Sequence, residues 1–204
     1  MKTILAAAIF LLVPLAASAE KADALKPVNI EYDKANVDQV TQNYVATGNV
    51  IITRGTLILK ADRAEVKESP EGFRTFILTA NPGKVATFRQ KRDGGPDLWG
   101  EGQAQRIEYD DRNDVVKLFS KAVIRQLEGK KVTQEMVSEF ISYDNRSEVL
   151  LGRNDATGAD KPGNGRGSIT LQPRRTPAAG AAPAPAPGAA PAAGTPAAGT
   201  PAAG

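Results

Sequence analysis

The side chains able to do chemistry in this sequence are carboxylates, amines and guanidinium groups, because the chain contains no histidine and no cysteine. A Ser-His-Asp or Cys-His arrangement therefore cannot form, and disulfides, thiolate nucleophiles and cysteine-based zinc sites are excluded. The commonest metal ligand and the usual base near neutral pH are missing as well. We therefore expect a protein that is not an enzyme, with no catalytic residue, no resident metal and no cofactor.

Two short motifs could still bind ions. Asp110, Asp111 and Asp114 could hold a hard cation, although acidic residues in turns between strands are far commoner. Residues 163–167 resemble part of a phosphate-binding loop, but no strand precedes them and no helix pattern follows. We interpret the acidic residues as a turn and the glycine-rich segment as a linker.

The start of the chain has the layout of a secretory signal peptide. Lys2 precedes the apolar residues 4–15, and small residues at 17–19 predict cleavage between Ala19 and Glu20. A membrane-spanning helix needs about 20 apolar residues, which is longer than the segment 4–19. Removal of residues 1–19 takes away one base and no acid, so the net charge falls from +3 to +2. We expect an exported, periplasmic protein whose balanced charge does not indicate nucleic-acid binding.

Composition divides the remaining chain into a folded domain and a tail. Residues 173–204 are almost entirely alanine, proline, glycine and threonine, which predicts a disordered spacer. Residues 20–154 are enough for one folded domain. One further short strand is predicted at 168–171, which would extend the folded part to about residue 172. The Pro/Ala/Gly-rich tail has too little large apolar area to offset the entropy lost on ordering.

The pattern of residues 20–154 is strand-like throughout. Apolar and polar residues alternate, at least in part, at 28–32, 49–53, 106–109 and 140–143, and turn residues separate these runs. Residues 132–140 can also be interpreted as a helix, and we prefer the strand interpretation. Many short strands at close spacing predict an all-β domain.

The strands also repeat. The sequence Ile-Glu-Tyr-Asp at residue 30 recurs at 107 and as Ile-Ser-Tyr-Asp at 141, with a weaker copy at 64, so the starts lie 34, 43 and 34 residues apart. A fixed period made of strands predicts stacked β units that share one apolar groove. Period-2 spacing then places three sets of side chains on matching faces: Val28, Ile30 and Tyr32; Ile107 and Tyr109; Ile141 and Tyr143. The alternative is that these side chains only fill a sandwich core.

Four motifs in sequence order resemble the OstA-like domain family. They are PVNIE at 27–31, ATGNVIITRGTL at 46–57, ADR at 61–63 and KVATF at 84–88, and the resemblance covers about residues 24–154. The resemblance implies a V-shaped or twisted β-jellyroll of stacked antiparallel strands with an open apolar interior. It also implies that the domain carries lipopolysaccharide from the inner to the outer membrane as a bridge protein.

The resemblance further implies partners and lipid contacts. Such domains stack end to end with copies of themselves, with an LptC-like inner-membrane protein and with an LptD-like outer-membrane protein. The family pattern places the lipid portion of lipopolysaccharide against Val28, Ile30, Phe88 and Tyr109, and the repeat adds Leu57, Leu59, Ile107 and Tyr143. Headgroup phosphates favour bases near the mouth of the groove, for which the candidates are Lys26, Arg54, Lys60, Arg63 and Arg106. An ordinary surface charge is the commoner role for each of these bases.

Three other functions compete with this one. A stacked-strand, β-helix-like enzyme that degrades polysaccharide would direct paired carboxylates into a polar groove, whereas the repeated inward face here is apolar. A structural periplasmic scaffold would carry no lipid. A membrane-anchored LptC-like relative would retain the first residues of the chain instead of losing them at Glu20.

Overall fold

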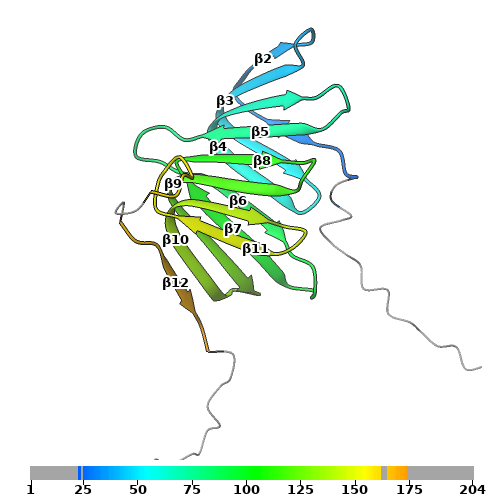
Figure 1. Ribbon diagram of the computed structural model, residues 1–204. Coiled ribbons are helices and arrows are strands. Elements are labelled where there is room, and N and C mark those ends of the chain that lie inside the picture. The colour runs from blue at the N-terminus through cyan, green and yellow to red at the C-terminus, as the bar shows by residue number, and fades with distance from the viewer. Residues whose placement is uncertain (1–22, 24, 162–164, 174–204) are drawn as a thin grey trace, which may run out of the picture. The chain divides into compact units, whose positions relative to one another are not determined.

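The computed structural model describes residues 23, 25–161 and 165–173, which form an antiparallel sheet of 12 strands (Figure 1). The all-β prediction is therefore confirmed. The predicted signal peptide, its cleavage site at Ala19 and Glu20, and the tail beyond Pro173 lie outside the described residues. The strands are β1 (Asn29–Glu31), β2 (Lys34–Asp38), β3 (Asn43–Arg54), β4 (Leu57–Glu68), β5 (Arg74–Thr79), β6 (Ala86–Lys91), β7 (Leu98–Ala104), β8 (Arg106–Asp110), β9 (Val115–Glu128), β10 (Lys131–Asp144), β11 (Val149–Arg153) and β12 (Ser168–Leu171).

Four long strands each belong to two half-sheets. Strand β4 pairs with β6 through residues 58–60 and with β5 through residues 63–68. Strand β9 likewise pairs with β8 through 115–119 and with β7 through 123–128. The sheet therefore has two layers. Layer A holds β2, β5, β8 and β11, layer B holds β1, β6, β7 and β12, and the long strands β3, β4, β9 and β10 contribute one half to each.

The long strands change layer at irregular positions. Strand β3 shifts register between Thr47 and Val50, where Gly48 and Asn49 have positive φ angles of 77° and 46°. Strand β9 has the same feature at Ser120 and Lys121, with φ of 62° and 55°. Bulges of this kind bend a strand and increase its twist. We call the edge where the chain crosses between layers the vertex, and the opposite edge, where the hairpin turns lie, the mouth.

The core lies between the two layers. Alternate residues of both layers point inward, and those at the centre are almost fully buried. Ile107, Tyr109, Ile141 and Tyr143 are all at most 1% exposed, which confirms that the third and fourth copies of the repeat present matching inner faces. The prediction for Tyr32 is wrong, because it is 50% exposed: β1 ends at Glu31, and the chain then crosses to β2 in layer A.

Two strand predictions near the end of the domain are confirmed. Residues 132–140 are part of strand β10, and residues 168–171 form β12, which pairs with β10 through 134–137. The sheet thus continues past residue 154. All four residues of β12 are exposed, because this strand is the last one in layer B.

At both ends of the two-layered sheet the last strands have no neighbour on their outer edge among the described residues, and we call these strands unpaired. Layer A ends in β2 and β11, and layer B ends in β1 and β12 (Figure 1). Among the described residues, no helix is long and apolar enough to cross a membrane.

Candidate binding interior and its mouth

Six of the eight predicted lipid-contact residues lie together at the centre of the interior. Leu57, Leu59 and Phe88 point inward from layer B, and Ile107, Tyr109 and Tyr143 point inward from layer A. Each is at most 2% exposed. Tyr109 also stacks on Phe76, with ring centroids 5.8 Å apart. The structure therefore brings these residues together in one apolar cluster.

The centre of the interior is filled by the protein's own side chains. Gly100 and Gly102 face inward from β7, and a Cβ atom at Gly102 would lie only 2.8 Å from Cδ2 of Leu118 in layer A. The glycines let the layers approach closely, so Leu118 and Phe88 occupy the space between them. The continuously open interior implied by the family resemblance is therefore absent at the centre.

The first two predicted residues have a different environment. Val28 and Ile30 are only partly buried and pack against the edge of the core. They line a hollow at the N-terminal end of the sheet, together with Pro27, Tyr44, Val66, Glu68 and Arg74. The predicted residues therefore divide into a packed central group and an accessible group at one end.

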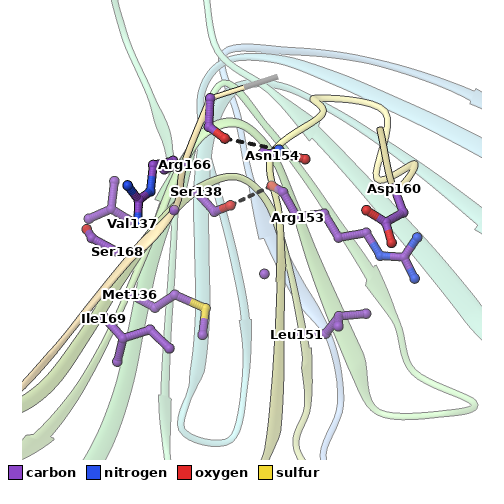
Figure 2. Close-up of a pocket in the computed structure, with 13 residues that line it drawn as sticks. Met136, Val137, Ser138, Leu151, Arg153, Asn154, Asp160, Arg166, Ser168 and Ile169 are labelled. Atoms are coloured by element: carbon purple, nitrogen blue, oxygen red, sulfur yellow. Dashed lines mark hydrogen bonds between the residues drawn. The ribbon is translucent and has the colours of Figure 1, made fainter. Parts of the chain in front are cut away.

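A second hollow lies at the C-terminal end, between β10, β11 and β12 (Figure 2). Its apolar lining comes from Met136, Val137, Leu151 and Ile169. Ser138 donates a hydrogen bond to the carbonyl oxygen of Arg153 in the same hollow. The outer strands of this end also expose large apolar side chains. These are Val149, Leu151, Ile169 and Leu171. The sequence did not predict the hollow at this end. Alternation of apolar and polar residues shows which side chains share a face, but it does not show which strands lie at the edge of the sheet.

Polar side chains bridge the two layers at the mouth. Arg54, at the end of β3 in layer B, forms an ion pair with Asp111 of layer A, with 3.3 Å between Nη1 and Oδ2. Its Nη2 group donates to the hydroxyl of Tyr109, which in turn donates to Asp114 at 3.0 Å. Arg54 is only 6% exposed, so the pair is shielded from water. The interior is therefore apolar in its depth and polar at its mouth.

Two more bridges lie along the same mouth. Asn145 of layer A donates to Asp114 at 2.8 Å and to Gln90 of layer B at 3.1 Å. Arg92, which follows β6 in layer B, forms an ion pair with Glu148 of layer A at 2.7 Å. Sequence reasoning missed these partners, since 55 residues separate Gln90 from Asn145.

Burial sets the protonation of the mouth groups. It raises the pKa of the Tyr109 hydroxyl, and the charge of Asp114 raises it further, so the hydroxyl stays protonated and able to donate. Burial also raises the pKa of Asp111, against the opposing effects of the Arg74 backbone N–H and the Arg54 guanidinium. Both shifts follow from the burial of Tyr109 and Asp111 at the mouth.

Most of the predicted headgroup bases lie elsewhere. Lys60, Arg63 and Arg106 precede inward-facing residues in their strands and are exposed, which agrees with the ordinary surface charge and not with a base at the mouth. Lys26 is exposed before β1. Of the five bases, Arg54 is the one that reaches the mouth, because it ends β3 and lies two positions after Ile52 and four positions after Val50, which both face inward.

The three predicted cation ligands serve other contacts. Asp110 accepts backbone N–H bonds from Arg112 and Asn113 and so caps its own turn. Asp111 and Asp114 point to the mouth. There Asp111 accepts hydrogen bonds from Arg54 and from the backbone N–H of Arg74, and Asp114 accepts one from Tyr109. Within the part of the chain that the structure describes, no three His, Cys, Asp or Glu residues are arranged to hold a metal ion.

The fold and the interior define a class of protein: a two-layered β-jellyroll with an apolar interior and unpaired strands at both ends. A solved structure with this fold is that of LptH of Pseudomonas aeruginosa, described as the LptA-homologous periplasmic component of the lipopolysaccharide transport device. The similarity has a TM-score of 0.63 at 22% identity and covers 74% of this chain and 99% of LptH.

Sequence comparison identifies the family. Residues 29–149 match the family of LptA/(LptD N-terminal domain) lipopolysaccharide transport proteins, and the chain belongs to that family. The lipopolysaccharide export system protein LptA of Haemophilus influenzae is 28% identical over 167 residues, which cover 82% of this chain and 88% of the relative. LptA of Escherichia coli K12 is 34% identical over 115 residues, which span 54% of this chain and 60% of the relative.

Proposed function

We propose that this protein binds lipopolysaccharide in the bacterial periplasm and passes it from the inner membrane toward the outer membrane. The observation that carries the proposal is the apolar interior, which runs between two layers from one unpaired end of the sheet to the other. The family membership and the names of the relatives support it.

The energetics of an acyl chain explain why such an interior suits transport. Each buried CH₂ group contributes about 0.8 kcal/mol, so a chain of about a dozen methylenes loses on the order of 10 kcal/mol on leaving a membrane for water. A carrier must therefore shelter the chain along its length. Because Leu118 and Phe88 fill the centre, the two layers must separate when acyl chains enter.

We assign the acyl-chain contacts to two groups. Val28 and Ile30 border the accessible hollow at the N-terminal end and contact the lipid first. Leu57, Leu59, Phe88, Ile107, Tyr109 and Tyr143 form the central cluster and contact the chains after the layers part. This order follows from the difference in exposure between the two groups.

The unpaired strands support end-to-end association. Exposed strand edges bind further strands through their free backbone groups. We therefore propose that β1 and β2 at one end, and β11 and β12 at the other, join copies of this chain to each other. The same ends would bind an LptC-like inner-membrane protein and an LptD-like outer-membrane protein.

Photocrosslinking in cells tests the proposal. A photoreactive amino acid at Ile30 or Phe88 is expected to form adducts with lipopolysaccharide, because both side chains face the interior. Lys60, the outward-facing neighbour of Leu59, serves as the matched control. Adducts at Lys60 with none at Ile30 or Phe88 would contradict the proposal.

The alternatives are separable by experiment. A polysaccharide-degrading enzyme needs carboxylates free to act in the groove, but Asp111 and Asp114 are already bound to Arg54, Arg74 and Tyr109. A scaffold would purify from cells without lipopolysaccharide. Amino-terminal sequencing of the mature protein tests the membrane-anchored alternative, since a start at Glu20 means that no anchor is retained.

A further inference from the structure

Two ion pairs join the layers at the mouth with the same polarity. In both of these pairs, which are the ones found among the described residues, layer B supplies the guanidinium and layer A supplies the carboxylate. Arg54 and Arg92 lie on adjoining turns, because the backbone N–H of Lys91 donates to Thr56. In these two pairs the cation therefore stays on layer B, and its counterion leaves with layer A when the two layers separate.

Arg54 has unused binding capacity. Its side chain is more than nine-tenths buried, its Nη1 and Nη2 groups contact Asp111 and Tyr109, and its Nε–H group has no hydrogen-bond partner among the described residues. A guanidinium binds phosphate through two parallel N–H bonds, one of which can come from Nε. Arg54 can therefore offer an anion more donors than Asp111 now uses.

Asp111 has a second hydrogen-bond partner besides Arg54. Its Oδ1 atom accepts the backbone N–H of Arg74 at 2.6 Å, within its own layer. The Tyr109 hydroxyl likewise keeps Asp114, which is also in layer A. Each of these layer A partners thus retains a hydrogen bond when Arg54 departs. Separating the layers leaves Arg54 in need of a new partner, as it does Arg92 and Gln90.

We propose that Arg54 is a phosphate-binding residue that exchanges Asp111 for an anionic headgroup when acyl chains enter between the layers. This inference rests on the proposed function, and it assigns the polar end of the lipid to the mouth. An amphiphile whose chains lie among the apolar core residues places its headgroup at the polar edge of the interior. A phosphate carries up to two negative charges against the one of Asp111, so it replaces the carboxylate favourably.

The test compares two lipids on the full-length protein. Purified wild-type protein and variants are titrated with lipopolysaccharide and with the same glycolipid after its phosphates have been removed. The readout is the affinity for lipopolysaccharide divided by the affinity for the dephosphorylated glycolipid. A general loss of folding or a wider mouth changes both affinities alike and leaves this ratio unchanged. Thermal unfolding confirms that each variant is folded.

Arg54→Gln is expected to lower the affinity ratio about tenfold or more, since a charge-assisted hydrogen bond to phosphate is lost. Asp111→Asn is expected to raise the ratio, because it removes the competing charge while the amide oxygen can still accept the Arg74 N–H. Arg106→Gln is the matched control, since Arg106 is an exposed arginine paired with Glu108 on the outer face of layer A, and it should leave the ratio unchanged.

Several outcomes overturn the proposal. Equal changes for both lipids in Arg54→Gln would make Arg54 a structural residue only. If inorganic phosphate alone binds the wild type but not Arg54→Gln, the anion site needs no acyl chain. That result would contradict an exchange of partners that occurs only when acyl chains enter. A wild-type protein that binds both lipids equally would refute the headgroup site and leave the proposed function intact, whereas binding of neither lipid would refute the proposed function itself.

Discussion

The centre and the ends of the sheet use the same kinds of side chain in different ways. Leu59 and Leu118, at the centre, have strands on both sides and a facing layer, and both are 0% exposed. Ile30 and Ile169, at the two ends, have the same apolar character but lack a strand on one side. The centre therefore holds the fold together, while the ends retain apolar surface for a partner.

Because of this difference, the central residues contribute mainly to the stability of the fold and the end residues mainly to binding. Residues with neighbours on every side contribute most of their apolar area to folding. Residues at an unpaired edge contribute less to folding and leave a surface that another strand or lipid can cover. We therefore expect substitutions at the centre to reduce stability and substitutions at the ends to reduce association.

The largest effect is expected from Leu59→Ala. This change leaves a cavity in the packed centre and should lower the free energy of unfolding by about 2–5 kcal/mol, measured by urea denaturation. A loss below ~1 kcal/mol would mean that the centre is loosely packed and would remove the contrast with the ends.

A smaller loss is expected from Gly102→Val. The new side chain would meet Leu118 and Phe88, so overpacking should lower the free energy of unfolding by about 1–3 kcal/mol. Adding Leu118→Ala should recover part of this loss in a double-mutant cycle. Strict additivity of the two changes would show that the layers do not meet at Gly102.

Ile30→Ala should cost about 1 kcal/mol of unfolding free energy, because Ile30 is only partly buried. Lipopolysaccharide binding should fall by a larger factor than in an equally destabilised central variant. The comparison uses the affinity measured well below the melting temperature of both variants. Equal binding losses would place the lipid elsewhere.

The smallest effect on stability is expected from Ile169→Lys. Ile169 is exposed on the last strand of layer B, so the change should alter the free energy of unfolding by no more than about 0.5 kcal/mol. A charge on an edge strand opposes pairing with another chain. Self-association measured by sedimentation should therefore weaken, and unchanged association would exclude β12 from the end-to-end contact.

Part of the fold and of the candidate site could be predicted from local patterns. The alternation of residues identified the strands, and the repeat placed Ile107, Tyr109, Ile141 and Tyr143 on one inner face, as observed. The same argument failed for Tyr32, because alternation holds only within a strand and β1 ends one residue earlier. The mouth could not be predicted, since Arg54 and Asp111 lie 57 residues apart in the chain.

Residue types and short spacings establish the strand-forming pattern, the repeat and the absence of histidine and cysteine chemistry. The division of single strands between two layers, at bends near Gly48 and Ser120, is visible only in the folded chain. Folding also places the polar bridges of the mouth. It also decides that the interior is packed at its centre, polar at its mouth and unpaired at its ends. These features arise from contacts between distant segments, which local periodicity does not encode.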